Sequence, residues 1–449
     1  MKFFLSKTFV LLVVFFLVQF PIHWTQSINT ERMAFKNDAV MSVNKSYAGQ
    51  QTIGGPILVF PYTRVYWENI HNANGEVVRK EQRSDKGQVS FLPTDLVFDN
   101  HMAVEERKVG IFPVPVFISN INISAKFNWS NSQDAAVVKP GDTIKWESAY
   151  IALPISDQHG IKSVETLTWN SEAIIYQPGS ALPLYSGAGI NATVIAEPSA
   201  GQGQVEIKLT LIGTERLYNL PTANQTRATT ESNWPHPQFT GTQLPDERSV
   251  TEQGFTATWK SNALATNIQN LWQECFIGSN CKNLESEAVG VQLIDPTNFY
   301  TKVDRALKYG LLFLAITFIA FILFEVLCDL NIHPIQYTLL GVASGIFFLL
   351  LLSIAEHTGF ALAYIIAAGA CLSLLTVYVQ AILKRWMRTL TFSSLLAGLY
   401  AALFTILQLE DAALLTGSIL IFSLLTAAMM LTRHIDWHAW QTKFSKTSA

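Results

Sequence analysis

The feature that most constrains this sequence is the clustering of its apolar residues into six segments, one near the start and five in the last third. A bilayer core of about 30 Å needs roughly 20 apolar residues in helical form. We therefore predict an integral membrane protein. Its transmembrane helices are expected at residues 8–24, 310–327, 334–354, 360–383, 390–407 and 412–431. The last five are joined by connections of four to six residues, which predicts a C-terminal five-helix bundle with antiparallel neighbours.

The first segment could be a signal peptide or an anchor. A short basic start at residues 1–7 precedes its apolar run, which fits both. A signal peptide needs small residues at its cleavage site. The run ends instead in the bulky residues Phe20-Pro21-Ile22-His23-Trp24. This favours an uncleaved N-terminal transmembrane anchor helix.

Orientation follows from Lys and Arg in short loops, which favour the cytoplasm. The N-terminus, the loop 384–388 and the tail 432–449 are basic, and with six crossings all three fall on one side. The short loops on the opposite side carry acidic residues and no Lys or Arg. We therefore expect both termini in the cytoplasm and residues 25–305 on the far side of the membrane.

Residues 25–305 alternate apolar and polar side chains, which is typical of half-buried strands. Val205, Ile207, Leu209 and Leu211, for example, are separated by polar residues. Asn74-Gly75 between two such runs predicts a tight hairpin. The pattern predicts an antiparallel β-sandwich-like domain and thus an α+β membrane protein.

Two helical patterns interrupt the strands. Residues 28–43 have loosely helical spacing and could continue the first membrane helix. Leu264, Ile268 and Leu271 form an apolar stripe that predicts a second helix packed on the β domain. Gly341 and Gly345, and separately Gly398, provide small faces for close helix packing.

The usual signatures of catalysis are missing from the sequence. It has no phosphate-binding GxxxxGK[ST], no zinc-binding HExxH and no GxSxG elbow. A net charge of −3 gives no basic footprint for nucleic acid. We therefore nominate no catalytic, cofactor-binding or metal-binding residue, and expect no enzyme activity and no nucleic-acid partner.

Four ionisable residues are expected near the outer membrane face, namely Glu356, His357, Glu410 and Asp411. Ionisable groups at membrane depth often mark ion or proton pathways. At the interface they can instead cap helices, because a carboxylate near a helix N-terminus complements the macrodipole. We favour capping over transport.

The stretch Trp234-Pro235-His236-Pro237 is a candidate rigid loop, because the two prolines fix the backbone around the imidazole. It could bind a ligand, but a structural crossover between sheets is favoured.

Cys275 and Cys281 are six residues apart and could pair in an oxidising compartment or remain two unpaired thiols. The spacing leaves both readings open, while a metal site is disfavoured because no second Cys or His pair accompanies them.

Tryptophans recur in the predicted strands, among them Trp67, Trp129, Trp146, Trp169 and Trp234. Their rings could stack on sugars, but tryptophans on alternating strands normally fill a sandwich core.

Several stretches together resemble the CreD family, bacterial inner-membrane proteins also called Cet after tolerance to a colicin. They include GGPILVFPY from Gly54, VEERKVGIFPVPVF from Val104, SNWPHPQFTGTQLPDERSVTEQGFTATW from Ser232, HPIQYTLLG from His333 and LLLLSIAEHTGF from Leu349. The resemblance implies an anchored periplasmic β domain followed by a membrane bundle. It also implies association with a two-component system that responds to the envelope or carbon supply, and it supplies no catalytic residue.

The sequence thus predicts an inner-membrane protein of envelope integrity or stress response with a non-enzymatic binding or signalling role. Its expected partners are the lipid bilayer and an envelope component or membrane protein. Two alternatives remain. An ion- or proton-coupled transporter or channel would use the four ionisable residues, and a periplasmic cell-wall or glycan hydrolase would need two suitably spaced carboxylates.

Overall fold

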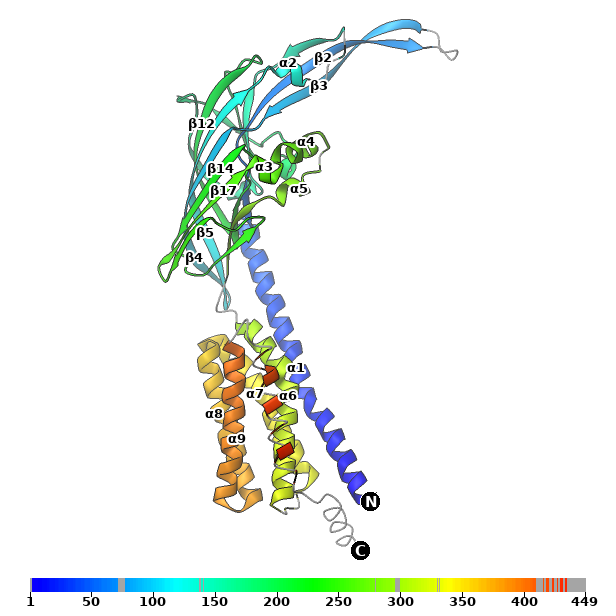
Figure 1. Ribbon diagram of the computed structural model, residues 1–449, viewed down its shortest axis with the longest axis vertical. Helices are drawn as coiled ribbons and strands as arrows, with labels where there is room; N and C mark the ends of the chain where they lie inside the picture. Colours follow the sequence, from blue (N-terminus) through cyan, green and yellow to red (C-terminus); the bar gives the residue numbers. More distant parts are fainter. Residues whose placement is uncertain are drawn as a thin grey trace. The chain divides into compact units, whose positions relative to one another are not determined.

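The computed structural model describes residues 2–71, 77–136, 139, 141–278, 280–294, 299–328, 330, 332–408 and ten isolated positions between 415 and 433 (Figure 1). The chain forms two compact units. The helical unit comprises Met1–Asn37 and Thr297–Ala449, and the β unit comprises Asp38–Pro296.

The first helix, α1, runs from Lys2 to Ser46 and is much longer than the predicted anchor at 8–24. The boundary expected at residue 25 therefore falls inside a helix. The helical spacing of residues 28–43 explains the extension, since Val40 and Val43 continue an apolar stripe that packs on Val114 and Val116 in the β unit. The helix accommodates Pro21, whose carbonyl accepts a hydrogen bond of 2.8 Å from Thr25 Oγ1.

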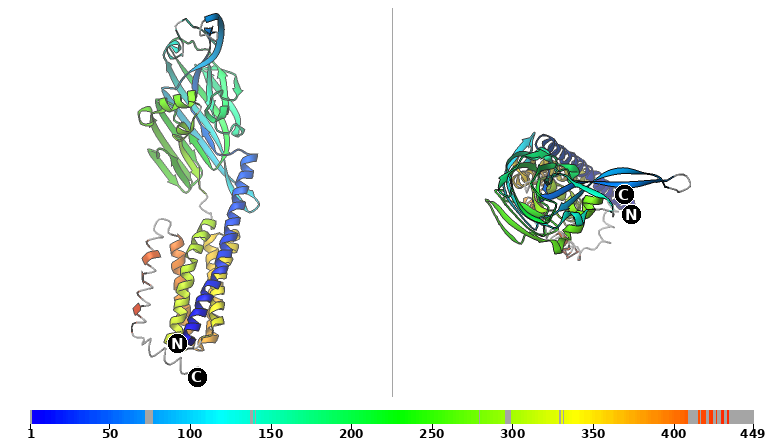
Figure 2. Two further views of the ribbon diagram at one scale, coloured as in Figure 1. Left: turned by 90° about the vertical axis from the view of Figure 1, so that its right-hand side faces the viewer. Right: turned by 90° about the horizontal axis from the view of Figure 1, so that it is seen from above.

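Four C-terminal helices are long and apolar enough to cross a membrane among the residues described. They are α6 (Phe299–Leu327), α7 (Pro334–Thr358), α8 (Phe360–Leu383) and α9 (Trp386–Gln408), and they run side by side (Figure 2). The prediction of an N-terminal helix, a β region and apolar C-terminal helices is confirmed at this level, although the N-terminal helix is longer than predicted. The segment predicted at 412–431 lies largely outside the described residues.

Two glycines let α1 and α7 approach closely. A Cβ on Gly341 would lie 2.6 Å from Val18 Cγ1, and one on Gly345 would lie 3.1 Å from Pro21 Cβ. The Gly-x-x-x-Gly spacing places both on one helix face, as predicted. Gly398 differs, because a Cβ there would meet nothing within 4 Å.

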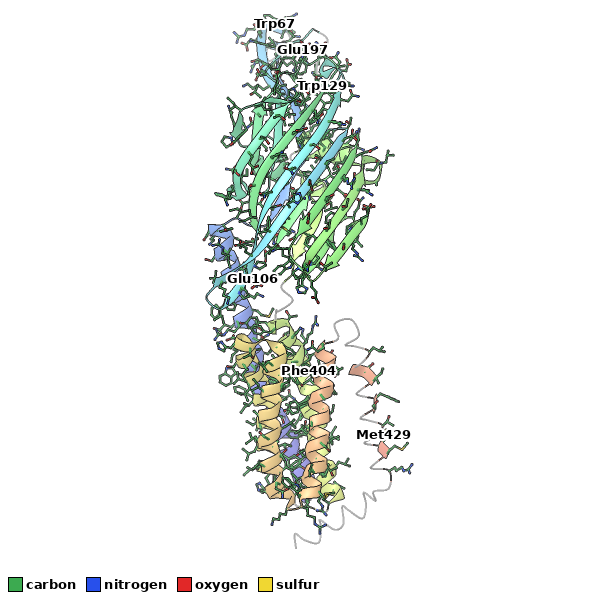
Figure 3. The ribbon with its side chains drawn as sticks, turned by 90° about the vertical axis from the view of Figure 1, so that its left-hand side faces the viewer. Trp67, Glu106, Trp129, Glu197, Phe404 and Met429 are labelled. Atoms are coloured by element: carbon green, nitrogen blue, oxygen red, sulfur yellow. A yellow bond between two sulfur atoms is a disulfide. The ribbon has the colours of Figure 1, made fainter. Side chains whose placement is uncertain are left out.

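Among the described residues, the largest sheet of the β unit has eight strands, and Figure 3 shows it face on. In spatial order these are β16 (Glu247–Thr251), β17 (Gly254–Asn262), β14 (Gln225–Ser232), β4 (Asp95–Val109), β5 (Phe112–Trp129), β12 (Gly201–Thr214), β8 (Ile161–Trp169) and β9 (Glu172–Ala173). Its neighbours are antiparallel except β4 and β14, which are parallel. Parallel neighbours need a long crossover connection rather than a hairpin, and here the chain from β5 to β13 supplies it.

In the described part of the β unit, a second sheet has six strands and a third has four. The second contains β10 (Tyr176–Pro178), β11 (Gly189–Thr193), β7 (Tyr150–Pro154), β2 (Ile57–His71) and β3 (Val77–Phe91), with β6 (Thr143–Trp146) also paired to β2. The third contains β1 (Gln51–Ile53), β13 (Arg216–Asn219), β18 (Val289–Leu293) and β15 (Pro237–Gly241). Since β1 and β13 are also parallel, the expectation of a purely antiparallel domain was wrong at two pairings.

One hydrophobic core is shared by strands of all three sheets. The alternation in β12 is confirmed, because Val205, Ile207, Leu209 and Leu211 are all buried in it. Three tryptophans join this core, as predicted for tryptophans on strands: Trp129, Trp169 and Trp259. Trp67 is the exception, with 61% of its surface exposed.

Short helices complete the β unit: α2 (Ser132–Ala135), η1 (Gln158–Gly160), η2 (Leu184–Gly187), α3 (Ala263–Thr266), α4 (Ile268–Gly278) and α5 (Lys282–Glu285). The predicted apolar stripe was wrong at Leu264, which is 94% exposed. Asn267 has a left-handed backbone (φ 52°) that separates α3 from α4. The buried face therefore starts anew at Ile268 and continues through Trp272 and Cys275.

The outer parts of β2 and β3 form a two-stranded ribbon, which we call the arm (residues 66–71 and 77–83). Up to Val65, β2 also pairs with β6, but beyond it β2 pairs, in the part of the chain that the structure describes, with β3 alone. The ribbon extends past the other strands of its sheet (Figure 1). The predicted turn Asn74-Gly75 lies outside the described residues, although the strands on either side pair as an antiparallel hairpin requires.

Candidate functional site

The most polar site in the helical unit is built around Glu356, in the last turn of α7. Its Oε1 accepts a hydrogen bond of 3.1 Å from the hydroxyl of Tyr300, in the first turn of α6. The same oxygen lies 3.4 Å from Nε of Arg32, in α1. The Glu356 side chain is only 12% exposed, while that of Arg32 is 43% exposed. One carboxylate therefore joins three helices.

Asn29 extends this site one turn along α1. It is buried, and its Nδ2 donates a hydrogen bond of 3.3 Å to the backbone oxygen of Tyr300. Its Oδ1 is also buried and has no hydrogen-bond partner within the described part of the chain. A buried acceptor without a donor costs roughly 1–3 kcal/mol. The unpaired oxygen of Asn29 therefore destabilises this contact relative to a purely apolar one.

The structure does not bring the four predicted ionisable residues together in one site. Glu356 is in the site, but its neighbour His357 is exposed, and Glu410 and Asp411 lie outside the described residues. Because the C-terminal end of a helix carries partial negative charge, a carboxylate there does not act as a cap. The positive charge of Arg32 instead offsets the unfavourable interaction between the Glu356 carboxylate and this helix end. Arg32 and Tyr300 were missed because neither stands out in the sequence, although both lie in helical stretches that flank apolar runs.

A second carboxylate is buried between α6 and α7. Glu325 is 4% exposed and accepts hydrogen bonds from the hydroxyl of Tyr337 (2.6 Å) and the backbone N–H of Ile332 (3.0 Å). The side chain therefore spans from the end of α6 to the first turns of α7. Its contacts fix the connection between these two helices.

The predicted rigid loop connects β14 of the eight-stranded sheet with β15 of the four-stranded sheet. Trp234 Nε1 donates a hydrogen bond of 3.1 Å to the backbone oxygen of His236, and the two rings are nearly perpendicular. Trp234 packs against the main core, whereas the His236 ring is exposed. Pro235 and Pro237 bracket the imidazole, and Pro237 already pairs with Leu293 as the first residue of β15. This geometry is that of a crossover between sheets.

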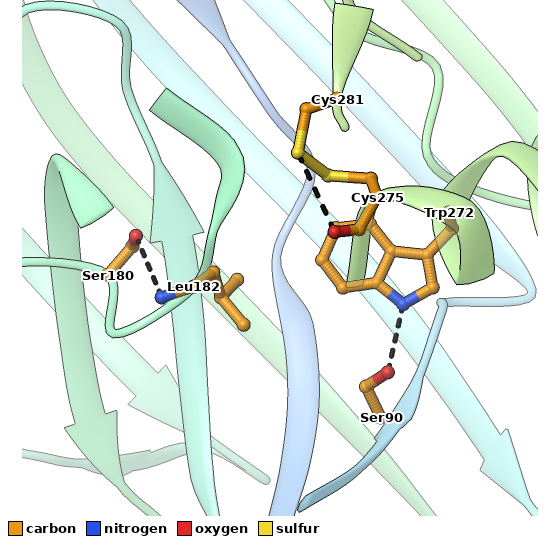
Figure 4. Close-up of a disulfide and its surroundings, with 6 residues drawn as sticks. All are labelled: Ser90, Ser180, Leu182, Trp272, Cys275 and Cys281. Atoms are coloured by element: carbon orange, nitrogen blue, oxygen red, sulfur yellow. Dashed lines mark hydrogen bonds between the residues drawn. A yellow bond between two sulfur atoms is a disulfide. The ribbon is translucent and has the colours of Figure 1, made fainter. Parts of the chain in front are cut away.

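Cys275 and Cys281 are joined by a disulfide that connects α4 to the start of α5 (Figure 4). Both cysteines are buried in a second apolar core beneath α4. Trp272 Nε1 donates a hydrogen bond of 2.9 Å to Ser90 Oγ on β3, which attaches α4 to the six-stranded sheet (Figure 4). Within the described residues, no three His, Cys, Asp or Glu side chains are grouped to hold a metal ion.

Asp157 anchors the chain that leaves α1. Its Oδ2 accepts a hydrogen bond of 3.1 Å from Gly49 N, and its Oδ1 accepts one of 3.0 Å from His159 N and lies 2.9 Å from His159 Nδ1. Partial burial raises the pKa of this carboxyl, but the hydrogen bonds from Gly49 and His159 outweigh it, so the pKa of Asp157 is lowered. The carboxylate form is therefore the one that the fold favours.

The arm exposes apolar side chains among charged ones. Trp67, Val77 and Val78 are each more than half exposed (Figure 3 labels Trp67). Ion pairs link Arg83 to Glu68 across the two strands (3.0 Å) and Arg79 to Glu81 along β3. An isolated two-stranded ribbon is only marginally stable in water. These ion pairs therefore support a surface whose described residues belong to neither of the two main apolar cores.

Comparisons with known proteins give one consistent result. Residues 3–438 match the family model described as "Inner membrane protein CreD". The chain is 33% identical over 445 residues to the inner membrane protein CreD of Escherichia coli K12, covering 96% of this chain and 93% of that protein.

Similarity to solved structures is slight. A two-domain M1 zinc metallopeptidase matches with a TM-score of 0.20 and 11% identity, over 37% of this chain and 38% of the other. The secretin InvG of the Salmonella SPI-1 injectisome matches with a TM-score of 0.07 and 8% identity, over 41% of this chain and 68% of the other. Neither likeness supports an inference about this chain.

Proposed function

The chain belongs to the CreD family of inner membrane proteins, and on that premise we propose that it binds a partner in the cell envelope and contributes to envelope integrity or stress response without catalysing a reaction. In this proposal α1 and the C-terminal helices anchor the protein in six crossings. Both termini are cytoplasmic and the β unit is periplasmic. The association with a two-component system stays a prediction from the family resemblance.

The arm is the observation that carries the proposal. Among the described residues, the ribbon pairs with no further strand on either outer edge, and Trp67 is 61% exposed. Tryptophan is among the residues that contribute most to protein interfaces when a partner buries it. The mixed charges of the arm suit a protein surface better than a uniformly charged polymer. We therefore assign the arm as the contact surface for an envelope protein.

Site-specific photo-crosslinking in native membranes tests this assignment. A photoreactive residue at Trp67 should give discrete adducts with another membrane or periplasmic protein. The matched control is Val250, which is 49% exposed on the edge strand β16 of the large sheet. Adducts from Val250 equal to those from Trp67, or none from either, would contradict the assignment of the arm.

The proposed topology has its own test. Reporter enzymes fused after Gln253 in the β unit and after Trp386 at the start of α9 should be active in opposite compartments. This follows because an uneven number of crossings separates the two positions in the proposed arrangement. Activity of both fusions in the same compartment would overturn the topology. It would not test the assignment of the arm, which depends on the crosslinking result.

Ion or proton transport is a second candidate, favoured by two carboxylates in the helical unit, Glu325, which is buried, and Glu356, which is 12% exposed. Ionisable residues in membrane-spanning segments often mark transport pathways. In liposomes, coupled flux that is lost in Glu325→Gln and in Glu356→Gln would support it. The exposed neighbour His357 gives a matched control as His357→Gln. Absence of flux in the unsubstituted protein removes this candidate and leaves the binding role untouched.

A further inference from the structure

An apolar groove of about 360 Å³ lies between α7 and α8. Its lining includes Leu339, Val342 and Ile346 from α7 and Ala370, Leu374 and Tyr378 from α8. Small Ala370 forms part of the hollow, and both helices are of membrane-spanning length and composition. The groove therefore faces the apolar part of the bilayer.

No helix among the described residues occupies this groove. Helix α1 contacts α7 through Gly341 and Gly345, which are not among the residues that line it. Gly417, a described residue of the last predicted segment, lies near Tyr309 of α6 and so belongs to another side of the helical unit. Within the part of the chain that the structure describes, the groove is open.

A basic loop lies at one end of the groove. Helix α8 ends at Leu383. Its junction with α9, which we call the basic loop, brings Lys384, Arg385 and, in the first turn of α9, Arg388 together with no acidic residue between them. Tyr378 is the lining residue of α8 nearest to this loop. Among the described residues none of the three basic side chains has an ion pair. Trp386, the first residue of α9, is 61% exposed beside them, and tryptophan favours the membrane interface.

We propose that the α7–α8 groove and the basic loop together bind an anionic phospholipid. One acyl chain lies in the groove, and the phosphate lies at the interface beside Lys384, Arg385 and Arg388. From Leu339 to Leu350 the α7 side of the groove extends about 16 Å, most of the length of a membrane acyl chain. Basic pockets between membrane helices are suited to anionic head groups.

Charge complementarity favours this occupant over a second copy of the chain. The loop offers three positive charges, whereas a second copy would bring the same three and repel them. A purely apolar partner would fill the groove but leave the loop unused. An anionic phospholipid satisfies both parts, with the charge at the interface and the chain in the hydrocarbon.

Native mass spectrometry of the full chain in detergent tests the proposal with phosphatidylglycerol and phosphatidylcholine as the two probes. The protein should retain phosphatidylglycerol in preference to phosphatidylcholine. The triple variant Lys384→Gln, Arg385→Gln, Arg388→Gln should lower phosphatidylglycerol retention about tenfold or more, because each basic residue near the membrane surface contributes roughly fivefold. Ala370→Trp, which fills the groove, should lower retention of both lipids.

Two controls separate the site from general effects. Lys126→Gln, Lys162→Gln, Lys208→Gln removes the same charge from the β unit and should leave retention unchanged. Ile365→Trp places the same ring on an exposed position of α8 outside the groove and should do likewise. Equal retention of the two lipids, equal losses in variants and controls, or a dimer that dissociates in Ala370→Trp would each overturn the proposal.

Discussion

The hydroxyl of Tyr300 and the carboxylate of Glu356, 56 positions apart in the chain, share a hydrogen bond of 3.1 Å that joins the first turn of α6 to the last turn of α7. Arg32 of α1 lies against the same oxygen. In a membrane bundle, apolar side chains pack equally well on lipid and on each other. A polar contact of this kind therefore helps to specify which helices are neighbours.

Tyr300→Phe and Glu356→Gln should each lower the free energy of unfolding by about 1 kcal/mol, because each removes part of one hydrogen-bonded group. The double variant should lose less than the sum of the two, since the residues share one interaction. Reversible unfolding in detergent micelles measures all three. His357→Gln, at the exposed neighbouring position, should be nearly neutral. Strict additivity would show that the two residues are not coupled.

Gly341→Ala should destabilise the helical unit by about 1–3 kcal/mol, because the new methyl group overpacks the contact with α1. Its Cβ would lie 2.6 Å from Val18 Cγ1 and 2.8 Å from Phe318 Cε2. Gly369→Ala is the matched control, since a Cβ there meets nothing within 4 Å and alanine favours the helix. Thermal unfolding of the two variants should shift in opposite directions, and equal destabilisation would contradict the close approach.

Replacing both cysteines in Cys275→Ala, Cys281→Ala should lower the stability of the β unit by roughly 2 kcal/mol, because the bond closes a short loop in the unfolded chain. The shift can be followed as loss of β-sheet circular dichroism on heating. Cys328→Ala removes a thiol that has no disulfide and should change little. Alkylation of Cys275 in unreduced, denatured protein would show that the bond is absent.

Acid should weaken the attachment that Asp157 makes to the chain after α1. Hydrogen bonds to Gly49 and His159 hold the pKa of Asp157 below its usual value despite the opposing effect of partial burial. A depressed folded-state pKa gives stability that is complete above the unfolded pKa and is lost as the pH falls through the folded pKa. Asp157→Asn should therefore lower the free energy of unfolding by about 1 kcal/mol at pH 7. As the pH falls below about 5, the free energy of unfolding of this variant should decrease less steeply than that of the unsubstituted protein.

Urea unfolding of the full chain across this pH range provides the measurement for Asp157. Glu172→Gln, at an exposed carboxylate in the two-residue strand β9, is the control and should keep the pH dependence of the unsubstituted protein. A variant Asp157→Asn with an unchanged acid slope would show that this carboxylate does not contribute to acid sensitivity.

Periodicity made the regular parts of the fold predictable. The alternation in β12 and the long apolar runs of α6 to α9 report burial directly, because each repeats the geometry of its element. The break at Asn267 was not predictable, since a left-handed residue other than glycine is set by its surroundings rather than by its side chain. Leu264 was assigned to the wrong face for that reason.

The polar site was only half predictable. Glu356 drew attention as a charge beside an apolar run, but its partners come from helices far away in the sequence. The pairing of Arg32 with Glu356 depends on which helices pack together, and a single sequence carries no signal for that. The parallel pairing of β4 with β14 was not predicted either, because hairpin signals indicate pairing only between strands that are adjacent along the chain.

Burial of Cys275 sets an order of events during maturation. Its side chain has no exposed surface once Trp272 of α4 has docked on Ser90 of the sheet beneath. An oxidant can therefore reach the sulfur only while this helix is still undocked. A cell short of oxidising catalysts would accumulate chains whose β unit closed over two free thiols, and later oxidation could not repair them without partial unfolding.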